Sequence, residues 1–295
     1  MWGPVVNFES SKLASGLYLI ATPIGTARDI TLRALDLLAS ADVIAAEDTR
    51  SMRRLMEIHG IALGARPLLS YHDHSGEGAR ARLMRALSEG QSVVYASEAG
   101  TPLVSDPGFD LVRAARDEGF GVTSAPGPSA AITALTLAGL PTDRFFFAGF
   151  LPSSTGKRKS ALAELAVVPG TLIFYESPHR IAAAVADAAK VLGAERPAAI
   201  CRELTKKFEE VLTGTLAELA ELSAERRLKG EIVFLVGRKN SSNIRDIDLD
   251  SEVLEALESM SVRDAADDVA ARTGMKRRDV YQRALALAKE RKAEE

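Results

Sequence analysis

The chain has 295 residues, enough for about two domains. Its 46% hydrophobic and 26% charged residues are typical of a globular protein and exclude a largely disordered chain. The net charge of −3 excludes nucleic-acid binding driven by the charge of the whole molecule, so any such binding requires a local basic surface.

The single cysteine, Cys201, excludes an internal disulfide and a metal cage built from cysteines. Among the four histidines only His72 and His74 are close, and in a strand that spacing places both on one face. We interpret them as part of a turn, with a metal pair as the alternative, and predict no metal. The apolar run 130–140 is shorter than the roughly 20 residues that span a bilayer. With no secretory signal at the N-terminus, we expect a soluble, cytoplasmic protein.

Short apolar runs alternate with helical patterns through the first part of the chain. Strands are predicted at 16–21, 43–46, 68–71, 92–96 and 120–124. Helices are predicted at 31–39, 77–88 and in a segment that ends near 59–60, where Gly60 fits the position after a helix. Strands separated by helices indicate a mainly parallel sheet, and the apolar strands indicate that both faces are covered. We predict an α/β domain over 14–125.

Pro126-Gly127-Pro128 interrupts regular structure and marks a domain boundary. A helix is predicted over 129–139, with Ser129 as its capping residue. Strands are predicted at 144–148, 171–175, 198–201, 209–213 and 231–236, with a helix over 177–192. These elements predict a second α/β domain over 126–238.

The polar segment 239–250 has the composition of a linker. After it, 251–295 is predicted to be a small helical module. Ser261 and Asp264 resemble a capping box, and Ala270, Gly274 and Val280 have the spacing of a helix-turn-helix. Seven basic and two acidic residues lie between Lys276 and Lys292. The last helix is therefore either a nucleic-acid contact or an ordinary solvated helix.

Three loops rich in glycine and proline follow apolar strands: 22–25, 97–108 and 126–130. In open parallel sheets ligands bind at the carboxyl ends of the strands. Glycine and alanine let the backbone approach a ligand closely, and proline fixes the loop before binding. The sequence contains no G-x-G-x-x-G at the first helix and no G-K-[ST], which disfavours dinucleotide and nucleoside-triphosphate sites. We predict a small polar ligand at this edge, against the alternative of three tight turns.

Seven segments occur in the order found in one protein family: TPIGTARDITLRAL, IAAEDTR, SEAGTPLVSDPG, APGPSAAITAL, FYESPHR, CRELTKKFEE and KGEIVFLVG. On these segments the chain resembles the ribosomal RNA small-subunit methyltransferase I family, a branch of the tetrapyrrole methylase superfamily. The resemblance covers about residues 14–237, and the C-terminal module is similar to one that this family carries. The fold it implies is two α/β domains of tetrapyrrole methylase type with a cofactor cleft between them, plus a helix-turn-helix-like module.

The resemblance implies methyl transfer from S-adenosylmethionine to the 2′-hydroxyl of a cytidine in the decoding region of 16S rRNA, by a homodimer. The residues that it assigns to the cofactor are Pro23, Glu98, Gly100, Thr101, Gly127, Ser129, Ala130, Tyr175 and Gly230. The sequence departs from the family pattern at Glu98, where the family has Asp, and at Thr26, where it has Asn. A direct contact of the longer Glu98 carboxylate with the cofactor is therefore in doubt, and the loop can act through its backbone instead.

A ribose hydroxyl is a poor nucleophile, so a general base is expected. The candidates are Asp48 and His179, with Glu47, Glu176 and Glu203 as further carboxylates at strand ends. Each has a structural alternative. Asp48 can cap the helix that starts near Thr49, Glu176 and Glu203 can pair with Arg180 and Arg202, and His179 can be an ordinary surface histidine near a helix N-terminus.

RNA contacts are expected from basic clusters. The predicted residues are Arg50, Arg53, Lys157, Arg158, Lys159, Lys206, Lys276 and Arg277, with Arg54, Lys207 and Arg278 beside them. The cluster at 157–159 follows a polar stretch, and we predict a mobile loop there that closes on RNA. Each cluster alone is equally compatible with a solvated surface.

Two other functions remain open at this stage. One is a methylase of small tetrapyrroles on the same fold, although the basic clusters and the helical module favour RNA. The other is a non-enzymatic ribosome-assembly or RNA-binding protein, which lack of S-adenosylmethionine binding would favour. A serine hydrolase is disfavoured because the chain has no G-x-S-x-G segment.

Overall fold

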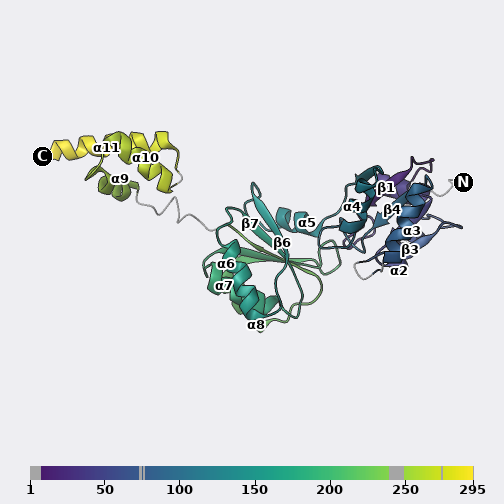
Figure 1. The fold of residues 1–295 in the computed structure, drawn as a ribbon. Helices are drawn as coiled ribbons and strands as arrows, with labels where there is room; N and C mark the ends of the chain where they lie inside the picture. The colour runs from purple at the N-terminus through teal and green to yellow at the C-terminus, as the bar shows by residue number, and fades with distance from the viewer. Residues whose placement is uncertain (1–7, 73–74, 76, 239–248, 274, 295) are drawn as a thin grey trace, which may run out of the picture. The chain divides into compact units, whose positions relative to one another are not determined.

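Two five-stranded sheets and a separate group of three helices make up the computed structural model (Figure 1). The structure describes residues 8–72, 75, 77–238, 249–273 and 275–294. The chain divides into two units, Met1–Gly237, which holds both sheets, and Arg238–Glu295, and each is described by itself.

The first sheet is parallel throughout, with the strand order β3-β2-β4-β1-β5. Its strands are β1 (Gly16–Ile20), β2 (Val43–Ala46), β3 (Leu68–Ser70), β4 (Ser92–Ala96) and β5 (Val122–Ala125). Its helices are α1 (Leu32–Ser40), α2 (Thr49–Ile58), α3 (Glu77–Ser88) and α4 (Phe109–Asp117). The predicted strands and three of these helices are confirmed within a residue or two. Helix α4 was not predicted, because its N-cap residue is Gly108, which has no side chain to cap the helix.

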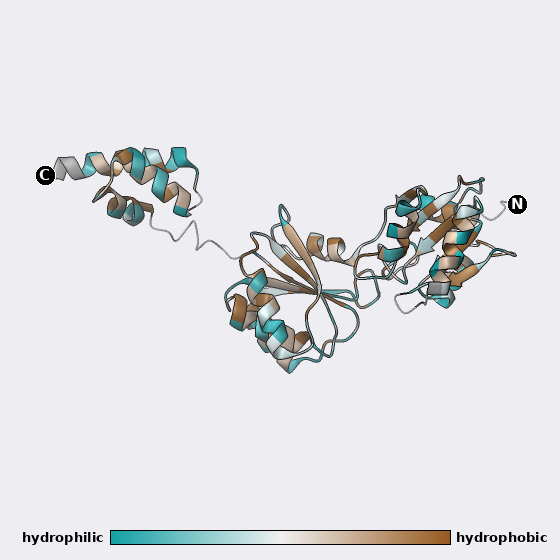
Figure 2. Ribbon diagram, viewed as in Figure 1, coloured by the Kyte–Doolittle hydropathy of each residue, from teal (hydrophilic) through white to brown (hydrophobic). Residues whose placement is uncertain are grey.

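The helices of the first sheet cover both of its faces, which explains why its central strands are apolar throughout. On one face Leu35 and Leu38 of α1 pack with Ile44 and Val94. On the other face residues of α3 and α4 pack around Leu17, Val93 and Tyr95. Figure 2 shows hydrophobic residues concentrated in the strands of both sheets. With both faces covered, the carboxyl edge of the sheet is left for the ligand loops.

The second sheet is mixed, with the order β6-β7-β10-β8-β9. Its strands are β6 (Phe145–Phe150), β7 (Thr171–Glu176), β8 (Pro197–Arg202), β9 (Glu210–Thr215) and β10 (Ile232–Val236). Only β6 and β7 are parallel; the other neighbours are antiparallel. The five strands and the helix after β7 were predicted close to their observed positions.

Four helices flank the second sheet: α5 (Ala130–Leu137), α6 (Thr155–Leu165), α7 (Ile181–Leu192) and α8 (Leu216–Glu225). Helices α6, α7 and α8 lie together on one face and α5 lies on the other (Figure 1). The predicted mobile loop at 157–159 is wrong, because these residues lie in the first turns of α6. Ser129 stands at the N-cap position of α5 but makes no capping hydrogen bond, so the predicted cap is absent.

The second unit contains α9 (Leu249–Leu257), α10 (Val262–Thr273) and α11 (Arg277–Glu294) around a core that includes Val253, Val269 and Val280. The Ser261 hydroxyl accepts a hydrogen bond from Asp264 N at 3.2 Å, as predicted, and donates to the Asp264 carboxylate at 2.7 Å. Gly274 of the predicted turn and most of the predicted linker lie outside the described residues. Within the described part of the chain, no helix has the length and apolar character needed to cross a membrane.

Candidate functional site

The three predicted loops meet at the carboxyl edge of the first sheet, because β4, β1 and β5 are neighbours there. Thr22 and Gly100 exchange two backbone hydrogen bonds of 2.9 Å, which join the first loop to the second. The Thr101 hydroxyl donates to Pro128 O at 2.9 Å, which joins the second loop to the third. The three loops gather at one edge, as expected, and form one hydrogen-bonded layer there.

Glycine is required at two points of this layer. Gly100 has φ +82°, a conformation that residues with a side chain rarely adopt. A Cβ at Gly127 would lie 2.9 Å from Ala21 Cβ, so the third loop approaches β1 more closely than any larger residue allows. Gly127 shapes the layer but does not line the cavity described next.

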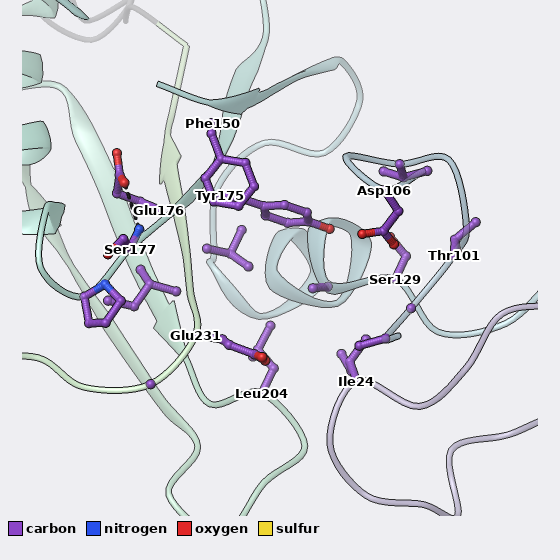
Figure 3. Close-up of a pocket in the computed structure, with 18 residues that line it drawn as sticks. Ile24, Thr101, Asp106, Ser129, Phe150, Tyr175, Glu176, Ser177, Leu204 and Glu231 are labelled. Carbon is purple, nitrogen blue, oxygen red and sulfur yellow. Dashed lines mark hydrogen bonds between the residues drawn. The ribbon is translucent and has the colours of Figure 1, made fainter. Parts of the chain in front are cut away.

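A cavity of about 340 Å³, here called the central cavity, lies between this layer and the edge of the second sheet (Figure 3). Six of the nine residues assigned to the cofactor line it: Gly100, Thr101, Ser129, Ala130, Tyr175 and Gly230. The sequence analysis missed Ile24, Ala99, Val104, Asp106, Phe150, Ser177, Pro178, Leu204 and Glu231, which also line it. All of them except Phe150 belong to the seven family segments, which therefore held a signal for them, whereas Phe150 is recognisable only in the fold.

Tyr175 is the central polar group of this cavity. Its hydroxyl points toward Asp106 and Ser129 (Figure 3). Burial raises the pKa of Tyr175, and the nearby Asp106 carboxylate raises it further, against hydrogen bonds with Ala131 N and Ser129 that lower it. Its ring packs edge-on against Phe150, with ring centroids 5.8 Å apart. The cavity thus combines an aromatic wall, a neutral hydroxyl and carboxylates.

A second depression, here called the α2 hollow, measures about 590 Å³ and lies between the first two loops and helix α2. Pro23 and Glu98, two of the predicted cofactor residues, line this hollow and do not line the central cavity. Asp48, Arg50 and Arg54 line it as well. The Glu98 N–H donates to Glu47 Oε2 at 3.2 Å, and its side chain is exposed. The two depressions therefore share the layer formed by the first two loops, and Glu98 serves the hollow.

Asp48 is the N-cap of α2, which was its structural alternative. Its Oδ1 accepts hydrogen bonds from Arg50 N at 2.7 Å and Ser51 N at 3.3 Å. These bonds lower the pKa of Asp48, so its carboxylate is charged at neutral pH. The capping role leaves the carboxylate partly exposed and facing the hollow.

None of the other base candidates lines the α2 hollow. His179 is exposed, with Nδ1 3.5 Å from Arg227 Nη2, and lines neither depression. Glu176 lines the central cavity, pairs with Arg180 as expected, and burial raises its pKa. Glu203 pairs with Lys206 rather than with Arg202, because Arg202 turns to Glu210. Among the described base candidates, Asp48 therefore has the best placement.

The structure divides the predicted RNA contacts into exposed and engaged residues. Arg50, Arg53, Lys157 and Lys276 are exposed, and the Lys159 ammonium lies 3.7 Å from Asp187. Arg158 is 3% exposed, and its guanidinium is paired with Asp187 at 2.7 Å. Lys206 bonds Glu203 at 3.0 Å and Glu231 at 2.9 Å, and Arg277 pairs with Asp267. The prediction for Arg158 is wrong, because a buried, paired guanidinium cannot reach a phosphate. The charges of Lys206 and Arg277 are already neutralised by the carboxylates that they pair with.

Among the described residues, no group of three or more Asp, Glu, His or Cys side chains lies close enough together to hold a metal ion. His72 is described, but His74 lies outside the described residues, so the pair is not defined. Cys201 is buried, and burial raises the pKa of its thiol to about 12.

Comparison with known proteins gives two family matches. Residues 16–220 match the Tetrapyrrole (Corrin/Porphyrin) Methylases, and residues 245–288 match the RsmI C-terminal HTH domain. The chain is 49% identical over 282 residues to "Ribosomal RNA small subunit methyltransferase I" of Mesorhizobium japonicum, covering 95% of each chain. It is 42% identical over 273 residues to the protein of the same name from Halalkalibacterium halodurans, covering 90% of this chain and 93% of that one.

Solved structures show the same fold at low identity. Uroporphyrin-III C-methyl transferase from Thermus thermophilus, complexed with S-adenosyl homocysteine, has a TM-score of 0.54 and 22% identity, covering 75% of this chain and 97% of that one. Diphthine synthase has a TM-score of 0.59 and 16% identity, covering 76% and 90%. With its methylase fold, its C-terminal helical module and relatives of 42–49% identity over nearly the whole chain, the protein belongs to the ribosomal RNA small subunit methyltransferase I family, a branch of the tetrapyrrole methylases.

Proposed function

We propose that the protein transfers a methyl group from S-adenosylmethionine to the 2′-hydroxyl of a cytidine in the decoding region of 16S ribosomal RNA. The family relatives carry names that state rRNA methylation. The single structural observation that supports the proposal best is the pair of depressions on one loop layer, because methyl transfer needs a donor site and an acceptor site side by side.

The central cavity suits S-adenosylmethionine in size and chemistry. Its volume of about 340 Å³ lies within the usual range of sites for small ligands. Tyr175 and Phe150 offer aromatic surface to an adenine ring. The Asp106 carboxylate lines the cavity and complements the positive charge of a sulfonium or an ammonium group. When bound, this cofactor supplies an electrophilic methyl group on sulfur.

The α2 hollow suits the acceptor nucleotide. Arg50 and Arg54 line its mouth with exposed guanidinium groups, which are suited to phosphate. Asp48 and Glu98 line the same hollow and present acceptors for a ribose hydroxyl. The Arg50 Nη2 atom lies 3.5 Å from Asp48 Oδ2. A phosphate bound by Arg50 would therefore lie close to the Asp48 carboxylate.

In this arrangement the protein contributes alignment and a proton acceptor. The Thr22–Gly100 bonds fix the loops that both depressions share, so the two sites keep a constant position relative to each other. With the cofactor bound, Asp48 would accept a hydrogen bond from the 2′-hydroxyl and take its proton as the oxygen–carbon bond forms and the carbon–sulfur bond of the donor breaks. Its backbone bonds to α2 hold the carboxylate in place.

Asp48→Asn tests this assignment, because Asn caps a helix about as well as Asp. We expect methyl transfer to fall by about 10²- to 10⁴-fold, with the dissociation constant of S-adenosylmethionine unchanged. Arg85→Ala is a suitable control, since Arg85 is exposed on α3 and lines neither depression. Undiminished transfer by Asp48→Asn would remove the base assignment, and transfer to a small tetrapyrrole instead of rRNA would replace the substrate.

We also infer a homodimer. Five large apolar side chains on α5 and the edge strand β6 are exposed: Ile132, Leu137, Phe145, Phe146 and Phe150. A second copy that covers part of this surface would remove them from water. Light scattering of the purified protein should give twice the chain mass, and Phe145→Glu should give the single-chain mass; a wild-type protein of single-chain mass contradicts the inference.

A further inference from the structure

The loop 203–209, between β8 and β9, lies beside both depressions. Thr26 N donates to Thr205 Oγ1 at 3.2 Å, which ties the loop to the first loop of the other sheet. A Cβ at Gly25 would lie 2.4 Å from Thr205 Oγ1, so the two loops are in close contact. Leu204 lines the central cavity, and Gly25 lines the α2 hollow. The tip of the loop, two or three residues farther on, is therefore near the proposed site of methyl transfer.

Hydrogen bonds and ion pairs from several neighbouring groups hold this loop in place. Thr205 N donates to Glu209 Oε2 at 2.6 Å, and Arg202 Nη1 donates to Phe208 O at 3.2 Å. Lys206 Nζ bonds both Glu203 and Glu231. Glu203 and Thr205 hold positive φ angles of 51° and 62°, which residues with side chains adopt only where the surroundings impose them. The tip is consequently presented in a fixed conformation.

An aromatic ring stands exposed on this tip. Phe208 is 63% exposed, although the loop around it is held by side-chain bonds. Lys207 Nζ lies 5.5 Å from the centroid of the ring. Proteins that bind unpaired RNA combine such aromatic side chains, on which bases stack, with cations that follow the backbone.

The charges around Phe208 that form no ion pair are predominantly positive. Arg202 Nε donates to Lys229 O at 3.0 Å, which places the segment of Arg227 and Lys229 beside the loop. Lys207, Arg227 and Lys229 are exposed, and none of them forms an ion pair with any described residue. Three of the nearby carboxylates are paired with cations: Glu203 and Glu231 with Lys206, and Glu210 with Arg202 and Arg226. The fourth, Glu209, accepts a hydrogen bond from Thr205 N and is outnumbered by the three cations. The surface is thus complementary to an anion.

We propose that Phe208 is a stacking platform for an unpaired nucleobase of the RNA substrate, and that Lys207, Arg227 and Lys229 hold the adjoining phosphates. This inference rests on the proposed rRNA methylation and names residues that position its substrate. A second copy of the chain is a less suitable occupant, because a symmetric contact would bring like charges together. The larger exposed apolar surface of α5 and β6 lies on other elements.

Binding of a single-stranded RNA oligonucleotide of the decoding-region sequence to the full-length protein tests the proposal. Phe208→Ala should weaken binding by about 10-fold, the effect of losing one stacked base, and Phe208→Trp should restore it. Phe109→Ala is the matched control, because Phe109 is 65% exposed and has Arg113 over its ring at 5.7 Å. Lys207→Gln should reduce the dependence of log affinity on log salt by about 0.7.

Fluorescence gives a direct readout of stacking. Trp2 is the single tryptophan of the chain, so Phe208→Trp in a Trp2→Phe background carries its only indole at the platform. RNA should quench its emission, whereas duplex RNA of the same sequence should not. Unchanged emission with single-stranded RNA would overturn the stacking role.

The outcomes distinguish a failure of this inference from a failure of the proposed rRNA methylation. If the wild type methylates small subunits and Phe208→Ala binds RNA as tightly as the wild type, the platform is refuted while the methylase function stands. If Phe208→Ala alters the oligomeric mass measured by light scattering, the residue belongs to an interface between copies and the proposal is wrong. If the wild type neither binds the RNA nor methylates small subunits, the proposed function itself fails.

Discussion

Asp187→Ala removes the carboxylate that faces the buried guanidinium of Arg158. The Arg158 Nε and Nη2 atoms lie 2.8 and 2.7 Å from Asp187 Oδ2, and the two side chains are 4% and 8% exposed. After the substitution, Ser153 O at 3.0 Å remains as a partner, but it carries no charge. An unpaired buried charge destabilises a protein by about 3–5 kcal/mol. For a unit of this size, that lowers the melting temperature by roughly 6–20 °C.

Thermal unfolding followed by circular dichroism measures this effect. Lys159→Ala is the control, because Lys159 is 43% exposed and reaches Asp187 only at 3.7 Å, so its loss should cost less than about 1 kcal/mol. The double substitution Arg158→Met with Asp187→Leu should recover most of the stability, since it removes both charges. An Asp187→Ala protein that melts within roughly 2 °C of the wild type would refute the reasoning and return Arg158 to the candidates for RNA binding.

Three further predictions follow from the loops and the core. Gly25→Ala should weaken S-adenosylmethionine binding, measured by calorimetry, by about 10-fold, because the added Cβ would meet Thr205 and push the first loop away from the loop 203–209. Gly156→Ala is the control and should leave binding unchanged, because no atom lies within 4 Å of the added Cβ. Glu98→Ala should leave cofactor affinity unchanged but slow methyl transfer, because Glu98 lines the α2 hollow; weaker cofactor binding would contradict that placement. Burial raises the pKa of Cys201 to about 12, so the native thiol should resist Ellman's reagent at pH 8. The free energy of unfolding should also fall as the pH rises from about 9 to 12, because only the thiol of the unfolded chain ionises in that range.

The fold was predictable where periodicity and turn residues agree. The strands of both sheets are apolar runs bounded by glycine, proline or polar residues, and each was found near its observed position. Helix α4 was missed because Gly108 provides no capping side chain. Helix α6 was missed because its start is rich in Ser, Thr, Gly and Lys, a composition that also suits a loop. Helix α8 carries a full capping box of Thr215 and Glu218, a signal that the sequence analysis overlooked.

The site was predictable at the level of loops and less so at the level of side chains. Parallel strands bring their carboxyl ends to one edge, so the expectation that the three loops share this edge followed from the predicted parallel sheet. The side of the layer on which Pro23 and Glu98 lie depends on the path of the loop, which the sequence does not specify. The burial of Arg158 depends on Asp187, 29 residues away on another helix. Long-range pairings of this kind decide whether a basic residue is a contact or a structural element.

The most direct measurement of the central claim is incubation of the purified protein with methyl-labelled S-adenosylmethionine and small ribosomal subunits from cells that lack it. Digestion of the labelled rRNA to nucleosides then shows which atom carries the label. The account predicts label on the ribose of one cytidine in the decoding region, and loss of that label with Asp48→Asn. Label on a base, label outside that region, or no label would contradict it.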